Sequence, residues 1–288
     1  YQNSARALFE RHPVYEGISM EDLWDEHGKA PHLLVIGLGY MGQNVVLQAA
    51  RLGHFPYEKQ VKITVIDKDI KSKKEVFLLN YPYIDKACQI DYAEYDIRKK
   101  DFYDEYLGKT DEYDYVINCI DNDQMTFISS IHIINRYRKV PIAIRMSGNN
   151  NLSGWIEDNR EDFKNVFTFG NISELSGIKS IIDEKINELA KAIHDNYNDG
   201  LKDGEVKHQW NELDIFSKSS NYAQADHIRT ILDLVGLTIK AEDELQDGDH
   251  VIKSFKEFLS IIEPRLEELS SIEHSRWMAF HFIEGWTV

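Results

Sequence analysis

The stretch that decides the fold of this chain is His32-Leu-Leu-Val-Ile-Gly-Leu-Gly-Tyr-Met-Gly-Gln-Asn-Val-Val-Leu-Gln-Ala-Ala-Arg51. Its apolar residues Leu33–Ile36 predict a buried strand, and the apolar spacing after the glycines predicts a helix. Between them, Gly37, Gly39 and Gly42 form the pattern G-x-G-x-x-G. The first glycine permits a tight turn, the second lets backbone approach a pyrophosphate, and the third lets helix and strand pack closely. The stretch therefore predicts a strand–turn–helix unit that can hold phosphates at the helix N-terminus.

An acidic residue stands where such a unit would use one. A second apolar run, Val61–Ile66, ends on Asp67, about 25 residues after the last glycine. A carboxylate at the end of the second strand can accept hydrogen bonds from a ribose diol, which disfavours the 2′-phosphate of NADP. The adjacent Lys68 would weaken that exclusion unless it is simply a solvated charge. We therefore expect a Rossmann-type nucleotide fold; the alternative is a glycine-rich turn beside an empty crevice.

Strand and helix patterns alternate through the first half of the chain. This alternation predicts a parallel sheet with right-handed crossovers, which binds ligands at the carboxyl ends of its strands. Asp96 follows the third strand, and Cys119, Ile120 and Asp121 stand at the end of the fourth, so we expect all four beside the ligand. The expected strands are Leu33–Ile36, Lys62–Ile66, Gln89–Tyr95, Tyr115–Cys119 and Ile142–Arg145, with a helix at Thr126–Arg136.

The chain divides by its patterns into four segments. Residues 1–31 should form a short helix over Ala5–Arg11 and then a linker, which would lie next to a membrane in a longer protein. Residues 32–148 form the Rossmann unit, and residues 149–185 connect it, with one more short strand expected at Thr168–Ile172. Helical spacing dominates residues 186–288. The expected fold class is an α/β parallel-sheet domain followed by a mainly helical domain.

The chain is strongly acidic, with a formal net charge of −16 over 288 residues. Such a charge repels nucleic-acid phosphates and anionic lipid, so neither is expected as a general partner. Cys88 and Cys119 are the only cysteines, and Cys119 lies in a predicted buried strand, so we expect a reducing cytoplasm and no disulfide framework.

No C-x-x-C or H-E-x-x-H pattern suggests a metal site, and no apolar run is long enough to span a bilayer. The chain starts at Tyr1 instead of Met and ends at Val288 without a polar tail. We therefore expect a piece of a longer protein.

The helical part contains an internal repeat. Leu189-Ala-Lys-Ala-Ile-His194-Asp-Asn-Tyr197 is similar to Leu269-Ser-Ser-Ile-Glu-His274-Ser-Arg-Trp277. In both copies His follows Leu by five residues, and an aromatic residue follows His by three, which places His and ring on one helix face. The pairs are either core histidines packed on rings or the two halves of a ligand platform around a pseudo-twofold axis.

Residues 33–146 resemble the nucleotide-binding half of the RCK or TrkA-N domains, which regulate potassium channels and transporters. The motifs that carry the resemblance are Gly37-Leu-Gly-Tyr-Met-Gly42, Val65-Ile-Asp67-Lys-Asp69, Tyr95-Asp96, Ile117-Asn-Cys-Ile-Asp121-Asn-Asp123 and Pro141-Ile-Ala-Ile-Arg145. The resemblance implies an adenine nucleotide or dinucleotide, with phosphates at the glycine turn and its Tyr40 and Met41, the ribose at Asp67, the adenine near Asp96 and Asp121 at the edge. It also implies pairing into a homodimer or a higher homo-oligomer.

Residues 186–288 resemble bacterial ryanodine-receptor (RyR) repeat domains, with the second copy incomplete. The resemblance rests on the two repeat copies, on Trp210-Asn-Glu-Leu213, on Ser220-Asn221-Tyr-Ala-Gln224-Ala-Asp226-His227-Ile228, and on Leu234-Val-Gly236 and Gly285-Trp286. It places His194, Tyr197, His274 and Trp277 near a common groove. In that groove Trp210, Trp277 and Trp286 are candidates to stack on a base, with Asn221, Gln224 and His227 on its edge. The alternative is that the tryptophans fill the core.

The two resemblances in one chain suggest a sensor that binds a nucleotide and does not catalyse a reaction. The combination is similar to bacterial sensor proteins in which a membrane-spanning segment precedes the Rossmann unit, with roles in ion transport or antiphage defence. The ligand would be NAD(H), ADP or ATP, or a signalling nucleotide, and the location the cytoplasm or the cytoplasmic face of a membrane. An NAD-dependent oxidoreductase is the alternative, although no Tyr-x-x-x-Lys or similar catalytic arrangement is visible. A third hypothesis is an interaction scaffold whose nucleotide crevice is degenerate and no longer serves as a binding site. We expect no catalytic residue and no metal.

Overall fold

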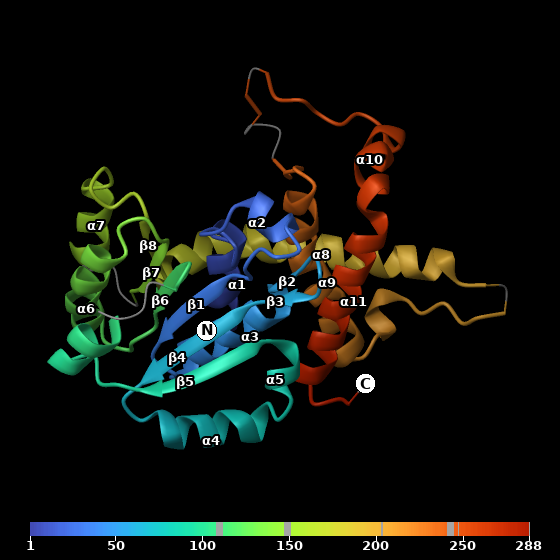
Figure 1. Ribbon diagram of the computed structural model, residues 1–288. Helices are drawn as coiled ribbons and strands as arrows, with labels where there is room; N and C mark the ends of the chain where they lie inside the picture. The colour runs from blue at the N-terminus through green and yellow to red at the C-terminus, as the bar shows by residue number, and fades with distance from the viewer. Residues whose placement is uncertain (108–111, 147–150, 203, 241–244, 247, 288) are drawn as a thin grey trace.

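Six parallel strands form the central sheet, in the order β5-β4-β1-β6-β7-β8 (Figure 1). The computed structural model describes residues 1–107, 112–146, 151–202, 204–240, 245–246 and 248–287, and gives only the backbone of 151–153, 157 and 172–183. The strands are β1 (His32–Ile36), β4 (Lys62–Asp67), β5 (Gln89–Glu94), β6 (Tyr115–Asn118), β7 (Ile142–Arg145) and β8 (Val166–Phe169). Numbered along the chain, this order is 3-2-1-4-5-6, the doubly wound order of Rossmann-like folds.

The expected parallel α/β sheet is thus confirmed. Five strands lie within one residue of their predicted ends. The sixth begins at Val166 and ends at Phe169, ahead of its predicted start and end. The expected domain boundary at residues 148 and 149 lies outside the described residues.

The strand register brings the predicted ligand residues to one edge of the sheet. Ile36, the last residue of β1, pairs with Ile66 of β4 and with Asn118 of β6. Because all three strands run in parallel, the residues that follow them share the carboxyl edge. Gly37, Asp67 and Cys119 therefore lie together although they are far apart in the chain.

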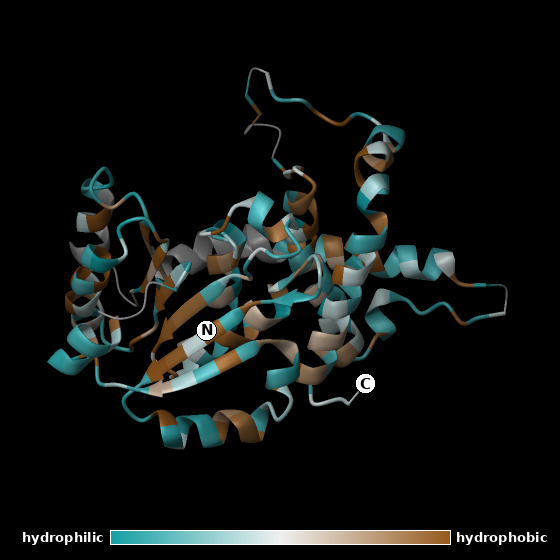
Figure 2. Ribbon diagram, viewed as in Figure 1, coloured by the Kyte–Doolittle hydropathy of each residue, from teal (hydrophilic) through white to brown (hydrophobic). Residues whose placement is uncertain are grey.

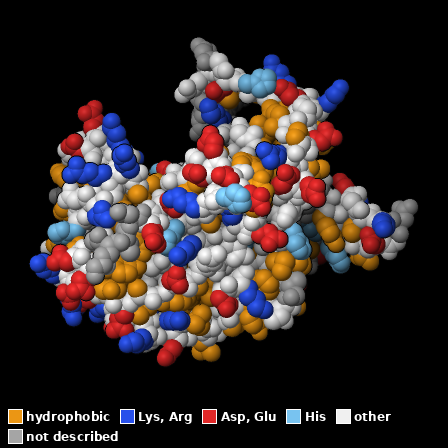
Figure 3. Space-filling view, viewed as in Figure 1, with side chains coloured by type: hydrophobic (Ala, Val, Ile, Leu, Met, Phe, Trp, Pro, Cys, Tyr) orange, Lys and Arg blue, Asp and Glu red, His pale blue; other side chains and the backbone are white. Residues whose placement is uncertain are grey.

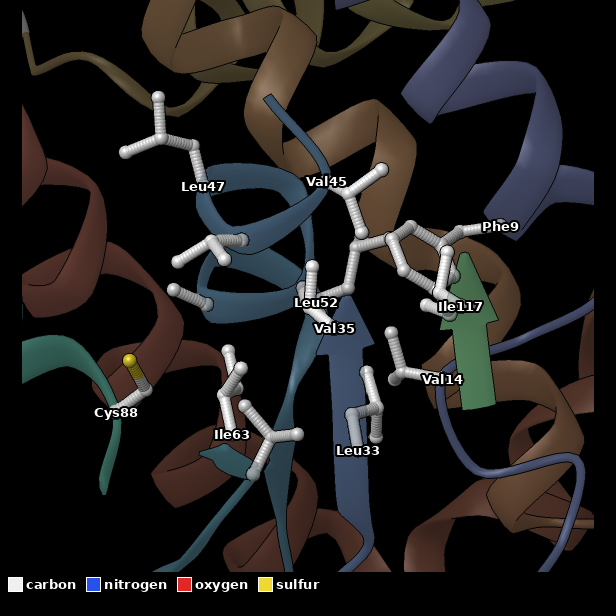
Figure 4. Close-up of a cluster of buried hydrophobic side chains, with 14 of the residues drawn as sticks. Phe9, Val14, Leu33, Val35, Val45, Leu47, Leu52, Ile63, Cys88 and Ile117 are labelled. Atoms are coloured by element: carbon white, nitrogen blue, oxygen red, sulfur yellow. The ribbon is translucent and has the colours of Figure 1, made fainter. Parts of the chain in front are cut away.

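Side chains that alternate along the strands contribute to two hydrophobic cores, one on each face of the sheet. Leu33 and Val35 point to the larger core, and Leu34 and Ile36 to the smaller one, as the period of two in a strand requires. Figure 2 shows the central strands as the most apolar of the sheet, and Figure 4 shows the larger core with Phe9 against the strand residues. This core contains residues of α1 (Gln2–Arg11), α3 (Tyr40–Leu52), α4 (Ile70–Asn80) and α5 (Ile84–Ala87); the smaller contains residues of the π-helical turn η1 (Phe102–Leu107), α6 (Asp123–Arg136) and α7 (Asn151–Asp158).

The N-terminal segment, expected as a short helix and a linker, is part of the larger core. Helix α1 buries Ala5, Leu8 and Phe9, because its apolar residues lie on one face. After α2 (Met20–Trp24), the Trp24 indole N–H donates to the Leu234 carbonyl at 2.8 Å. Residues 1–31 therefore pack on both halves of the chain.

The C-terminal part of the chain comprises α8 (Ile172–Gly200), the 3-10 turn η2 (Trp210–Glu212), α9 (Ile215–Leu234), α10 (Phe255–Ile262), the 3-10 turn η4 (Glu263–Arg265) and α11 (Leu266–Ile283). Two of the C-terminal helices contribute to the larger core, and a third, smaller cluster of Ile186, Ala190 and Ala225 lies between α8 and α9. Helices α9 and α11 pack against α3, and α11 also packs against α5 and the short hairpin of β2 (His54–Phe55) and β3 (Lys59–Gln60). Helix α10 extends away from the body in Figure 1. None of the described helices is long and apolar enough to cross a membrane.

Candidate functional site

A cavity of about 320 Å³ opens at the carboxyl edge of the sheet, where β1 and β6 lie side by side. The strand order reverses between these two strands, which is where doubly wound sheets bind ligands. Ten of the eleven residues predicted for the crevice line it: Gly37, Gly39, Tyr40, Met41, Asp67, Lys68, Asp96, Cys119, Ile120 and Asp121.

The eleventh predicted residue, Gly42, lies behind the cavity. A Cβ at Gly42 would stand 1.8 Å from the Gly37 carbonyl oxygen, so the helix can approach the turn only with glycine there. Gly37 has a φ of +97°, a left-handed conformation that glycine adopts without strain. A Cβ at Gly39 would meet no protein atom within 4 Å. The three glycines therefore serve packing, turn geometry and open space for a ligand.

The N-terminus of α3 borders this open space. Gly39 is its N-cap and supplies no side chain to cap the first N–H groups, and no acidic residue stands in the first turn. Unpaired N–H groups and the helix dipole together attract an anion. The start of α3 is therefore suited to a phosphate.

Asp67, at the end of β4, braces the glycine turn. Its Oδ2 accepts from the Leu38 N–H at 2.8 Å and from Lys73 Nζ at 2.6 Å, and its Oδ1 accepts from the Asp69 N–H at 2.9 Å. Burial raises the pKa of Asp67, but the hydrogen bonds from Lys73, Asp69 and Leu38 outweigh it, so the pKa lies below its ordinary value. An ionised carboxylate has about four lone-pair sites, which leaves room to accept from a ribose.

Three cations that the sequence analysis did not assign also line the cavity, and each pairs with a carboxylate at a strand end. Lys73 pairs with Asp67. The Arg98 side chain donates to both oxygens of Asp96, from Nε at 2.9 and 3.1 Å and from Nη2 at 2.6 Å, and its backbone N–H donates at 3.0 Å. The hydrogen bonds from Arg98 lower the pKa of Asp96 to about 2. The cavity holds four cations (Lys68, Lys73, Arg98, Arg145) and three acids (Asp67, Asp96, Asp121), in a chain of net charge −16. On the face drawn in Figure 3, basic and acidic side chains are interspersed.

Arg145, at the end of β7, is the most buried of these cations. Its side chain is 7% exposed, and its Nη1 lies 2.6 Å from Asp121 Oδ1, whose side chain is 80% exposed. The buried Nε has no hydrogen-bond partner among the described residues. The ring of Tyr1 lies 5.6 Å from the guanidinium carbon. An anion in the cavity could replace the exposed Asp121 beside Arg145.

Two further side chains fix the β6 end of the cavity. Asn118 is fully buried, and its Nδ2 donates to Ser129 Oγ at 2.9 Å and to Ser130 Oγ at 3.0 Å, which ties β6 to α6. Its position in a predicted apolar strand was the only sequence signal for that role. Burial raises the pKa of Cys119 to about 12, so its thiol stays protonated at neutral pH and contributes contact instead of nucleophilic chemistry.

The residues predicted for the RyR-like groove form two separate groups. His194 of α8 is buried, with Nε2 2.7 Å from the His208 carbonyl oxygen, and its ring lies 6.0 Å from that of Trp210. Tyr197 points outward and is exposed. Helices α8 and α11 both pack on α9, and α9 is the described element through which they are joined. The pairing of the two repeat copies around a common axis stays a prediction.

The second group is an exposed aromatic strip on α11. The ring of Trp277 stacks on His274 at 5.9 Å and lies 4.0 Å from His281, and Phe216 of α9 bridges His281 and Trp286. Of the other predicted groove residues, Asn221 bonds within α9 to the Ser217 carbonyl, and Gln224 is half-buried.

His227 lies in the core and not on a groove. It is fully buried, with Nδ1 3.3 Å from Glu273 Oε2. Burial lowers the pKa of His227 despite this partner, so the ring is neutral at neutral pH. The structure therefore assigns His227 a packing role that its sequence context did not predict.

No group of three or more His, Cys, Asp or Glu side chains is arranged to hold a metal ion among the described residues. No protein-family model matches the chain. No curated protein matches it either.

Proposed function

We propose that the crevice binds an adenine nucleotide or dinucleotide, namely NAD(H), ADP or ATP, and that the chain is a nucleotide-sensing regulator. The observation that carries the proposal is the uncapped N-terminus of α3 at Gly39, which borders a 320 Å³ cavity beside Asp67. A cavity of this size lies at the lower end of the range for small-molecule sites.

The lining residues could accommodate each part of such a ligand. The phosphates would accept from the first N–H groups of α3, near Gly39. The ribose would donate to Asp67, and the adenine would lie over the β5 end, between Asp96 and Ile97. Arg145 would neutralise charge that extends past the glycine turn toward β7.

A sensor is favoured over an oxidoreductase by what the cavity offers chemically. Among the described residues, no histidine lines it, and its cysteine is a protonated thiol. Its three carboxylates are each paired with a cation, so none is a free general base. The RCK-like and RyR-like resemblances support a regulatory output, through a homodimer and a second ligand or effector module; a role in ion transport or antiphage defence is proposed by analogy alone.

Replacement of Gly39 by Val tests the proposal. The Cβ of the new side chain would meet no protein atom within 4 Å, and its branches would occupy the space at the α3 N-terminus, so we expect nucleotide binding to be lost while the melting temperature is retained. Gly200→Val is the matched control, because a Cβ at Gly200 also meets nothing within 4 Å and Gly200 does not line the cavity. Calorimetric titration with NADH, NAD, ADP and ATP measures the effect.

Two results would contradict the proposal. One is that none of the four nucleotides binds the parent chain. The other is that Gly39→Val binds as tightly as Gly200→Val. Steady consumption of NADH in the presence of a small carbonyl substrate would show that the protein is an oxidoreductase and not a sensor.

A further inference from the structure

The rings of Tyr1 and Tyr40 stand together at the crevice, although Tyr1 was not among the residues predicted for it. Both residues line the cavity of about 320 Å³. Their ring centroids lie 6.0 Å apart, with the two ring planes within 11° of parallel. Tyr1 is the N-cap of α1 and Tyr40 is the first residue of α3, so the pair joins a residue outside the glycine turn to the turn itself.

The two rings lie on the β7 side of the glycine turn. Tyr40 directly follows Gly39, beside which the phosphates are proposed to lie. The Tyr1 ring lies 5.6 Å from the guanidinium carbon of Arg145, at the end of β7. Asp96, where the adenine is proposed, follows β5, which lies on the other side of β1 in the sheet. A ligand group that contacts the two rings would therefore be attached beyond the phosphates, on the side away from the adenine.

Much of the surface of both rings is open to solvent. Tyr40 is 75% exposed and Tyr1 is 56% exposed. Helix α1 packs on α3 and buries Ala5 and Leu8, so the exposed rings add little to that contact. Flat π systems stack on aromatic side chains, and loss of one such stacking contact weakens binding by about fivefold or more. The two rings therefore offer a stacking surface at the crevice.

We propose that Tyr1 and Tyr40 stack on a flat ring that the ligand carries beyond its pyrophosphate, and so make the crevice prefer a dinucleotide to a mononucleotide. The proposal rests on the nucleotide site proposed above and narrows its ligand class. In this arrangement the adenine lies at the β5 end, the pyrophosphate at the start of α3, and the second ring against the two tyrosines. A nicotinamide and a second purine share the required chemistry, because both are flat ring systems.

Three ligands that share one pyrophosphate test whether the second ring is bound. ADP-ribose has the adenosine, the pyrophosphate and the second ribose of NADH but no nicotinamide, and diadenosine pyrophosphate carries adenine in that place. We expect the parent chain to bind NADH or diadenosine pyrophosphate about fivefold or more tighter than ADP-ribose in calorimetric titration, equivalent to ~1 kcal/mol. The ligand with the larger preference identifies the ring.

Substitutions of the tyrosines test whether their rings cause this preference. Tyr40→Ala or Tyr1→Ala should reduce the preference over ADP-ribose, whereas Tyr40→Phe should keep it because the ring remains. Both tyrosines are exposed, so the melting temperature should be retained. Tyr57→Ala is the matched control, because Tyr57 is exposed between β2 and β3 and does not line the cavity.

Two outcomes would overturn the stacking role alone. One is that ADP-ribose binds the parent chain as tightly as NADH and diadenosine pyrophosphate do. The other is that neither Tyr40→Ala nor Tyr1→Ala reduces the preference. The nucleotide site stands in both cases, because ADP-ribose still binds. If none of the three ligands binds the parent chain, the nucleotide site fails and the stacking role fails with it, so the two failures are distinguishable.

Discussion

The three glycines of the turn differ in what a methyl group would meet, and this difference predicts different mutant phenotypes. Gly42→Ala places a Cβ 1.8 Å from the Gly37 carbonyl oxygen, so α3 must move away from the turn. We expect unfolding free energy to fall by about 1–3 kcal/mol, as for other overpacked cores. Gly39→Ala is the control, because its Cβ meets nothing. Urea denaturation measures both; equal stability of the two variants would contradict the packing role of Gly42.

Asp67 predicts a specific pH dependence of stability. Its pKa in the folded state lies below the ordinary value of ~3.9, so it stabilises the fold above that pH and the contribution is lost as pH falls through the folded pKa. Asp67→Asn should lower the unfolding free energy by about 1–3 kcal/mol at neutral pH and flatten its decline in acid. Chemical denaturation from neutral pH to below pH ~4 measures the slope. Asp69→Asn, at an exposed position, is the control and should show the same dependence of unfolding free energy on pH as the parent. The prediction is refuted if Asp67→Asn also shows the pH dependence of the parent.

Among the elements, α6 leaves apolar side chains in solvent. Ile133 is buried against the sheet, whereas Ile128 and Ile131 are 47% and 42% exposed and lie three residues apart on one helix face. A helix that is apolar beyond its buried stripe is usually covered on a second side. We predict that this face pairs with a second copy of the chain.

Light scattering tests the pairing. The parent should have the mass of a homodimer, and the double variant Ile128→Glu, Ile131→Glu should have that of a monomer, because charges would be buried in the interface. Val76→Glu, at a somewhat more exposed apolar position on α4, should remain dimeric. A monomeric parent at high protein concentration would refute the prediction.

On the scale of the whole molecule, the larger core joins the sheet to both ends of the chain. Leu234 of α9 and Ile272 of α11 belong to the same buried cluster as Leu33 and Val35 of β1. We therefore predict one cooperative unfolding transition for the chain, and not separate transitions for a Rossmann and a helical domain.

Leu234→Ala tests this cooperativity. It should lower the stability of the entire chain by about 2–5 kcal/mol, as other large-to-small core changes do. Hydrogen exchange should show amides of β1 and of α11 losing protection together. Ile239→Ala, at an exposed position, should change stability by less than about 0.5 kcal/mol. Two transitions, with the amides of β1 unaffected by Leu234→Ala, would contradict the shared core.

The sequence alone determined five of the six strands of the sheet, the glycine turn and the positions of Asp67, Asp96 and Asp121 at the carboxyl edge. These features are local: a strand needs only a short apolar run, and a turn needs glycine where a Cβ would collide or strain the backbone. The parallel order then follows from alternating strands and helices, since crossovers have a fixed hand.

Only the tertiary structure decided which charges meet. Arg6 pairs with Asp226 across 220 residues, and Arg51 with Glu284 across 233. His227 resembles a ligand residue in the sequence, yet α9 and α11 enclose it beside Glu273. The packing of the helices determines these partners. The sequence pattern does not predict them, because the same polar residue can face solvent or a buried partner.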